Sequence, residues 1–196
     1  FLDHEVFDYN KKYVDCKDRF IVYRSGRQVG KTMSTAVKAI HFAFFAPLML
    51  KTVKHECTIV IAAPTQNQAG IMFDRIRSLI VNNKFLKGYV VRNTQTEMWV
   101  NFLDNTGMSK IITRATGEHG TTLRGYSPHC IIADECSFIK TDILRAFLPS
   151  GMATLARVWL TSTPFSKSGY FFEACQNSKL KNPDGLWTEF HVKSTD

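Results

Sequence analysis

The chain has 196 residues, and its 44% hydrophobic and 21% charged content is ordinary for a globular protein that buries a core. Its formal net charge of +8 favours an anionic partner, most commonly nucleic acid, although a basic surface with no such partner is the alternative. The five cysteines are scattered and contain no Cys-x-x-Cys pair, which argues against a disulfide framework and for reduced thiols.

The first elements surround a glycine-containing loop. Residues 7–14 predict a short helix, and the apolar run 20–23 predicts a buried strand. The apolar positions 33, 36, 37 and 40 have the spacing of a second helix. A strand, a loop and then Gly-Lys-Thr at the start of a helix are the context of a phosphate-binding loop. The loop here reads Arg24-Ser25-Gly26-Arg27-Gln28-Val29-Gly30-Lys31-Thr32.

This loop predicts a nucleotide site. We expect the backbone N–H groups of residues 25–32, together with the helix dipole, to bind the phosphates of ATP. Lys31 would contact the β- and γ-phosphates, and the Thr32 hydroxyl would ligate Mg²⁺. The general pattern has glycine at the position of Ser25, so an ordinary strand-to-helix turn with a solvated Lys31 is the alternative.

The segment before a phosphate loop is often placed to contact the base. Tyr9 and Asn10 are the candidates in this sequence. Asn10 is one because an amide can pair with both a donor and an acceptor of adenine. The alternative is a helix that packs on the edge of the sheet without touching a nucleotide.

The helix that begins at Thr32 is expected to end near Ala46, because Pro47 cannot donate a backbone hydrogen bond. The apolar stretch 39–50 is too short to span a bilayer, so we expect no membrane association. Further apolar patterns predict the rest of the framework. They are a buried strand at 57–63, a helix at 71–80 that starts near 65, a hairpin of strands at 97–102 and 110–114, a buried strand from 157, and a last strand at 187–192.

Basic residues gather in the middle of the chain. Eight of them (positions 75, 77, 84, 87, 92, 110, 114 and 124) stand against three acidic residues (97, 104 and 118). We expect a track for the phosphate backbone of DNA in this section, with a solvated basic face as the alternative. The Gly-rich loop 117–128 is long enough to be functional or mobile.

Two later segments supply the chemistry that a phosphate loop needs. An apolar run ends in Asp134 and Glu135. Asp134 would hold Mg²⁺ through water, and Glu135 would orient and deprotonate the attacking water; a solvent-facing acid at a strand end is the alternative. The hydroxyl cluster Thr161-Ser162-Thr163 follows another strand and is expected near the γ-phosphate, unless it is a plain turn before Pro164.

Together these segments resemble the ATPase domain of the large terminase subunit, the DNA-packaging motor of tailed bacteriophages. The resemblance covers nearly the whole chain, and its first and third motifs are the most specific. The Ala-Pro-Thr segment is shared with helicases. The motifs, in order, are Arg27-Gln28-Val29-Gly30-Lys31-Thr32, Ala63-Pro64-Thr65, Leu123-Arg124-Gly125, Ile131-Ile132-Ala133-Asp134-Glu135 and Thr161-Ser162-Thr163-Pro164.

The resemblance implies an α/β fold, a RecA-like additional-strand (ASCE) P-loop ATPase with a mostly parallel central sheet and helices on both faces. It implies ATP and Mg²⁺ as cofactors. Its catalytic residues would be Glu135, Arg27 from the same subunit and Arg124 from a neighbouring subunit, with no choice made between the two arginines. Asn10 and Thr163 would join residues 25–32 in binding the nucleotide.

The resemblance also implies partners: double-stranded DNA, the portal of the procapsid, the small terminase subunit and further copies in a homo-oligomeric ring, in the host cell cytoplasm. Residues 1–196 would be one ATPase domain, and the nuclease domain of the family is not part of them. The main alternative is half of a helicase-like or repair translocase. That class usually has other residues where this chain has Cys136 and Ser137, and it needs a second RecA-like domain. A nucleotide-dependent switch is a third possibility, which Glu135 argues against.

Overall fold

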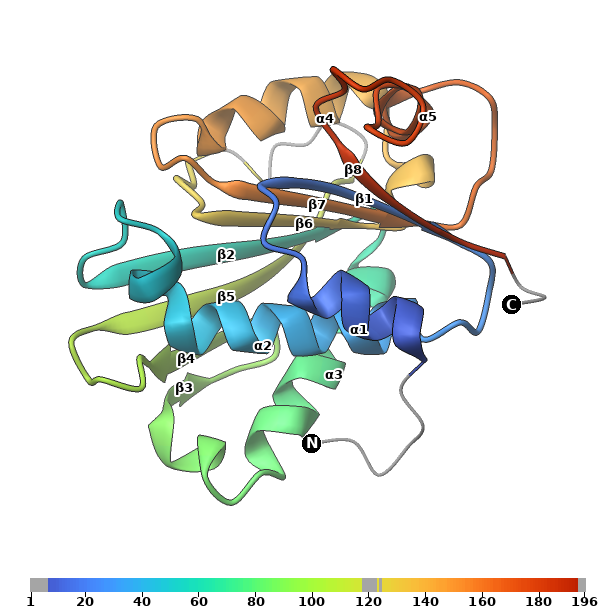
Figure 1. The fold of residues 1–196 in the computed structure, drawn as a ribbon. Helices are drawn as coiled ribbons and strands as arrows, with labels where there is room; N and C mark the ends of the chain where they lie inside the picture. The colour runs from blue at the N-terminus through green and yellow to red at the C-terminus, as the bar shows by residue number, and fades with distance from the viewer. Residues whose placement is uncertain (1–6, 118–122, 124, 194–196) are drawn as a thin grey trace.

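The computed structural model describes residues 7–117, 123 and 125–193, and the strands of these residues form one sheet in the order β3-β4-β5-β2-β6-β7-β1-β8 (Figure 1). Only the pairs β3–β4 and β4–β5 are antiparallel, and the other neighbouring pairs are parallel. The predicted mostly parallel α/β sheet is therefore confirmed. The strands are β1 (Phe20–Ser25), β2 (Glu56–Ala63), β3 (Val90–Asn93), β4 (Glu97–Asn101), β5 (Met108–Ala115), β6 (Cys130–Asp134), β7 (Arg157–Ser162) and β8 (Thr188–Val192).

Helices cover both faces of the sheet, as expected: α1, α2 and α3 lie on one face, and α4 and α5 lie on the other (Figure 1). Successive residues of a strand point to opposite faces, so β2 places Ile59 and Ile61 in one core and Val60 and Ala62 in the other. The helices are α1 (Asp8–Asp15), α2 (Lys31–Met49), α3 (Gln66–Val81), α4 (Thr141–Phe147) and α5 (Tyr170–Gln176), with short 3-10 turns η1 (Leu86–Tyr89), η3 (Cys136–Phe138) and η4 (Leu148–Gly151).

The α1 helix is fastened to α2 by Lys38. Its ammonium donates to the carbonyls of Tyr13, Val14 and Cys16 at 3.0, 2.9 and 2.5 Å. These carbonyls end α1 and have no helical donors of their own. Burial lowers the pKa of Lys38 to about 8. The contact holds α1 in a fixed position beside the start of α2.

The α2 helix runs through Pro47 to Met49, so the prediction that it would end before Pro47 was wrong. Pro47 has no N–H, which leaves the Ala43 carbonyl without its usual donor. The Ser109 hydroxyl of β5 donates to that carbonyl at 2.6 Å inside the core. A contact from a distant strand therefore makes the proline tolerable, and local sequence could not reveal it.

The predicted hairpin of β4 and β5 is confirmed, and so is the helix α3, whose buried residues are Ala69, Met72, Phe73, Ile76 and Ile80. The short strand β3 was not predicted, because its residues are mostly exposed and show no apolar alternation. All five cysteines are free. Within the described residues, none of the helices has both the length and the apolar character needed to cross a membrane.

Replacing Ser109 by alanine tests the origin of the long α2 helix. Ser109→Ala leaves the buried Ala43 carbonyl unpaired, and we expect it to cost about 1–3 kcal/mol of the free energy of unfolding. Adding Pro47→Ala restores a backbone N–H at the helical position, so the double variant should recover part of that loss. Urea unfolding of the wild type, both single variants and the double variant measures the coupling. Strictly additive effects would contradict this explanation.

Candidate functional site

The site lies where neighbouring parallel strands end. β7 lies between β1 and β6, and the three strands are in register, so that Tyr23, Thr161 and Asp134 stand side by side. The residues that follow β1 and β6 therefore emerge on the same edge of the sheet. The sequence pattern of two apolar strands, each ending in charged residues, thus becomes one site.

The loop between β1 and α2 depends on Gly30. Gly30 has a φ of 79°, in the left-handed region, and caps the start of α2. A Cβ atom at this position would lie 2.8 Å from Nδ2 of Asn10, so a larger residue meets both strain and a clash. Ser25 stands where the general loop pattern has glycine, but it is the last residue of β1 and pairs with Val192 in extended conformation. The serine therefore fits without strain.

A cavity of about 390 Å³ opens at this loop, and residues 26–33, Arg75, Glu135 and Thr163 line it. Seven of the eight loop residues predicted to bind nucleotide, Gly26 to Thr32, are therefore in the lining. Ser25 is buried and is not in the lining, which does not support a direct contact from its side chain. Arg27 is exposed within the cavity.

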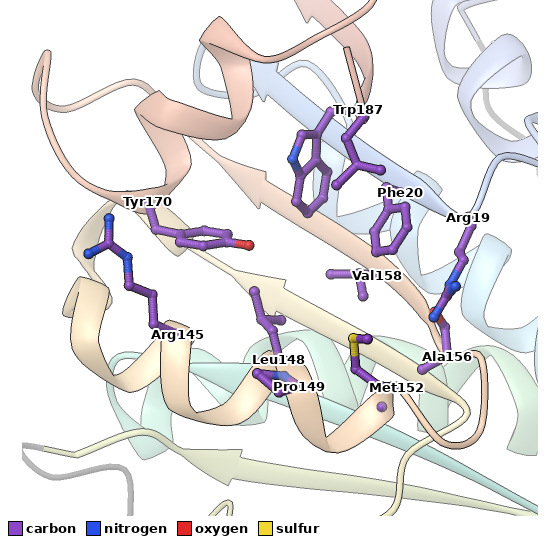
Figure 2. A pocket seen from close by; sticks show the side chains of 12 residues that line it. Arg19, Phe20, Arg145, Leu148, Pro149, Met152, Ala156, Val158, Tyr170 and Trp187 are labelled. Carbon is purple, nitrogen blue, oxygen red and sulfur yellow. The ribbon is translucent and has the colours of Figure 1, made fainter. Parts of the chain in front are cut away.

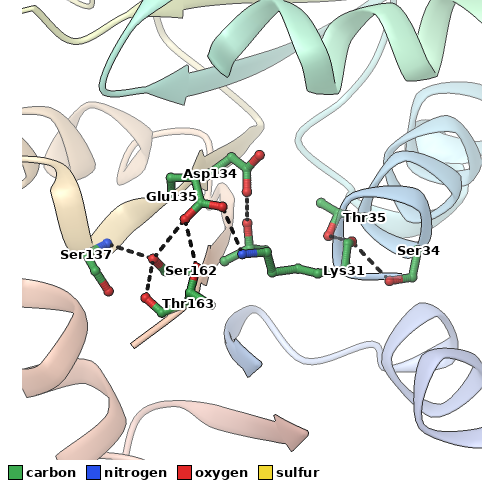
Figure 3. Close-up of polar contacts among 9 residues, drawn as sticks. Lys31, Ser34, Thr35, Asp134, Glu135, Ser137, Ser162 and Thr163 are labelled. Atoms are coloured by element: carbon green, nitrogen blue, oxygen red, sulfur yellow. Dashed lines mark hydrogen bonds and ion pairs between the residues drawn. The ribbon is translucent and has the colours of Figure 1, made fainter. Parts of the chain in front are cut away.

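Lys31 and Glu135 form an ion pair, with 3.2 Å between Nζ and Oε1 (Figure 3). Both side chains are largely removed from solvent, at 9% and 26% exposed. A charge in such a place needs a partner, because leaving it alone costs its hydration. The pair shows that the loop and the acidic strand end reach one point, 104 residues apart in sequence.

Glu135 has a strained backbone. Its φ of 48° and ψ of 42° are left-handed, which costs a non-glycine residue about 1–3 kcal/mol and persists only when neighbours enforce it. Its Oε2 accepts from the Thr163 hydroxyl at 3.3 Å and from the Ser162 hydroxyl at 3.5 Å (Figure 3). Lys31 on one oxygen and hydroxyls on the other fix the carboxylate at the mouth of the cavity.

Asp134 is buried beneath this pair, at 4% exposed. Burial raises its pKa, and the Thr161 hydroxyl, which donates to Oδ1 at 2.6 Å, acts in the opposite direction. The hydroxyl cluster 161–163 thus contacts both acids. The sequence placed these hydroxyls near the γ-phosphate but did not predict that they would hold the carboxylates.

The structure places Asn10 in the protein interior, and this corrects the prediction that it pairs with adenine. Its Nδ2 donates to the Val29 carbonyl at 3.1 Å, and its Oδ1 accepts from the Tyr23 hydroxyl at 2.7 Å. Both ends of the amide are therefore already used. The alternative, a helix that packs on the sheet, fits α1, and Asn10 supports the phosphate loop from behind.

The other predicted residues have mixed outcomes. Arg124 lies outside the described residues, so its proposed role stays a prediction. Four of the basic side chains assigned to a nucleic-acid track instead pair with acids of this chain, which weakens the case for the track as drawn from sequence. They are Arg77 with Asp74, Arg92 with Glu97, Lys110 with Glu56 and Arg114 with Glu97. Arg75 lines the cavity, which no sequence pattern indicated.

A second cavity, of about 280 Å³, lies at the opposite end of the strands (Figure 2). Phe20 and Val158 line it near the starts of β1 and β7, and Tyr170 and Trp187 complete an aromatic wall. Its arginines, Arg19 and Arg145, are engaged with the Ala156 carbonyl and Glu173. The cavity is mainly apolar and holds none of the loop or acidic residues, so it is not the candidate nucleotide site.

The donor set of the first cavity fits a polyphosphate with Mg²⁺. Arg27, Lys31 and Arg75 bring positive charge to the lining, and the start of α2 adds backbone N–H groups that face an anion. The Asp134 carboxylate and the Thr32 hydroxyl are hard oxygen ligands, which Mg²⁺ prefers. Among the described residues no group of three or more His, Cys, Asp or Glu side chains gathers as in a zinc site.

A mostly parallel sheet with one strand between the loop strand and the acidic strand, and a Gly-Lys-Thr loop facing an Asp-Glu pair, defines the RecA-like ASCE class of P-loop ATPase domains. The sequence matches the family described as terminase large subunit, T4likevirus-type, N-terminal, over residues 22–177. The chain belongs to this family, and it is the ATPase domain of a terminase large subunit.

Solved structures share the fold. The ATPase domain of the Thermus phage P74-26 large terminase has a TM-score of 0.76 at 20% identity, with 98% of this chain and 81% of that chain covered. The large terminase of bacteriophage HK97 has a TM-score of 0.72 at 16% identity, and that of another thermophilic bacteriophage has a TM-score of 0.71 at 13% identity. Each of these two comparisons covers 96% of this chain, but only 39% of the first protein and 46% of the second. Among curated protein sequences, none matches this chain.

Asn10→Ala separates a supporting role from base recognition. We expect the variant to lose about 1–3 kcal/mol of stability, because the Val29 carbonyl and the Tyr23 hydroxyl lose their partner. Its affinity for ATP should fall, and its affinity for GTP should fall by the same factor. Thermal unfolding and titrations with both nucleotides measure this. A selective loss of ATP over GTP would instead make Asn10 an adenine contact.

Proposed function

We propose that this domain hydrolyses Mg²⁺-ATP to drive double-stranded DNA into a viral procapsid. The observation that carries the proposal is the convergence of Lys31 and Glu135 in one basic cavity of a large-terminase domain. A charge pair of this kind is what a triphosphate would divide, with the ammonium binding phosphate oxygens and the carboxylate left free to act as a base.

Each residue of the site has a proposed role. The loop residues 26–32 and the Lys31 ammonium bind the polyphosphate, and Thr32 and Asp134 hold Mg²⁺, which supplies charge neutralisation when bound. Glu135 orients the attacking water and accepts its proton. Arg27, exposed in the same cavity, is placed to neutralise charge that develops on the phosphate. Arg124 of a neighbouring copy is a second candidate for that task.

The comparisons support nucleotide binding and leave the larger machine as part of the proposal. The large terminase of the thermophilic bacteriophage compared above has been solved with ADP and with ATP-γ-S. Its fold is shared with this chain, so we propose the same class of ligand here. The portal of the procapsid, the small terminase subunit and a ring of identical copies are proposed partners, acting in the host cell cytoplasm.

The alternative function is one half of a helicase-like or repair translocase. Family membership over residues 22–177 favours packaging. The two functions differ in what stimulates the enzyme. Stimulation of ATP hydrolysis by procapsids with linear duplex DNA supports packaging, whereas stimulation by single-stranded DNA with strand separation supports the helicase.

Glu135→Gln tests the catalytic assignment. The variant should bind ATP as well as the wild type does, but its hydrolysis should fall by at least about 100-fold, because the amide cannot accept the proton. Lys31→Ala is the comparison variant and should lose ATP binding itself. Hydrolysis and nucleotide affinity are measured separately, with procapsids and duplex DNA present. Full turnover by Glu135→Gln would remove Glu135 from the mechanism.

The pH dependence of hydrolysis tests the role of Asp134. Activity requires its ionised form, so activity is lost as the pH falls through its pKa, which burial raises. Thr161→Val removes the hydroxyl that lowers this pKa, and the acidic limb of the pH profile should therefore move to higher pH. Thr113→Val is the control, because Thr113 is an equally buried strand hydroxyl that bonds the Ala69 carbonyl away from the site. Equal shifts in both variants would contradict the assignment.

A further inference from the structure

An arginine from outside the phosphate loop reaches the cavity. Arg75 lies on α3, the helix that follows β2, and it lines the same cavity as residues 26–33, Glu135 and Thr163. Of the described lining residues, it alone comes from α3. The basic composition of residues 75–124 suggested a contact with DNA, whereas the geometry connects Arg75 to the nucleotide site.

The position of Arg75 is set by the core. Met72, Phe73 and Ile76 of α3 are fully buried against the sheet and α2, which fixes the rotation of the helix and turns Arg75 outward. The capping hydroxyl of Thr65, which accepts from the Gln68 N–H, fixes where the helix begins. The guanidinium is therefore carried by a rigid element and not by a loose loop.

Arg75 also has no partner among the described residues. Its neighbour Arg77 is engaged with Asp74 at 2.6 Å and with the Thr94 carbonyl. No hydrogen bond or ion pair of the described residues uses Arg75, whose side chain is exposed. A free guanidinium offers a planar fork of donors that matches phosphate oxygens.

The charge balance of the cavity gives this arginine a reason. Glu135 already pairs with Lys31, so Arg27 and Arg75 are the two cations of the described lining that remain unneutralised. A Mg²⁺-ATP complex carries a net charge of about −2 when its four phosphate charges are combined with the ion. The cavity is thus complementary in charge to that ligand only when Arg75 is counted.

We infer that Arg75 is a nucleotide-binding residue whose guanidinium contacts the polyphosphate of bound ATP from the α3 side of the cavity. This inference rests on the proposed function, because it assigns a further contact to the same site. It links α3, and through it the β2 side of the sheet, to the occupancy of the phosphate loop.

The test is the affinity of the chain for Mg²⁺-ATP-γ-S, measured by calorimetry without DNA. Arg75→Ala should raise the Kd by at least about tenfold, since a hydrogen-bonded charge is lost. Arg75→Lys should recover part of the affinity, because it keeps the charge but not the fork. Lys54→Ala removes one exposed positive charge from the turn between α2 and β2 and should leave the Kd unchanged. Circular dichroism confirms that each variant is folded.

The possible results separate this inference from the function on which it rests. If the wild type does not bind ATP-γ-S, the proposed function fails. If Lys31→Ala abolishes binding while Arg75→Ala binds as the wild type does, only the role of Arg75 is overturned. A variant Arg75→Ala with normal nucleotide affinity but weaker, less salt-dependent binding of duplex DNA would assign Arg75 to the DNA track.

Discussion

The ion pair between Lys31 and Glu135 is the interaction on which the whole site depends. It joins the first helical turn after β1 to the residue after β6, and neither charge has much water around it. The fold provides for this meeting through the parallel register of β1, β7 and β6, which brings their ends to one edge of the sheet. A shift of register by one residue would turn Asp134 or the strand-end hydroxyls to the other face of the sheet. The chemistry therefore depends on the apolar pattern of strands far from any ligand.

Behind the charged pair lies a shell of side chains that fix its members. Thr163 and Ser162 hold the Glu135 carboxylate in a strained backbone conformation, and Thr161 holds Asp134. On the other side, Asn10 joins the Val29 carbonyl of the loop to Tyr23 of β1. These contacts keep the reacting groups in place without relaxation of the loop, which is how a preorganised site stabilises developing charge. The hydroxyls of β7 contact both acids, so a movement of either acid is felt along this strand.

Much of the fold could be predicted from local patterns. The apolar runs of β2, β6 and β7 and the stripe of α3 predict their elements because burial alone decides them, and Gly-Lys-Thr between a strand and a helix predicts the loop. Contacts between distant residues could not be predicted in this way. The rescue of Pro47 by Ser109, the use of both ends of the Asn10 amide, and the arrival of Arg75 at the cavity each depend on tertiary packing. The position of Ser25 was a departure from pattern in sequence and is ordinary extended backbone in the structure.

The central claim is that one triphosphate binds between the loop and the acidic strand end. The most direct measurement is a crystal structure of the domain with Mg²⁺ and a non-hydrolysable ATP analogue. We expect the Lys31 ammonium to leave Glu135 and lie on phosphate oxygens, while Glu135 faces the terminal phosphate. An analogue bound elsewhere, or bound with the pair of Lys31 and Glu135 unbroken, would contradict this claim.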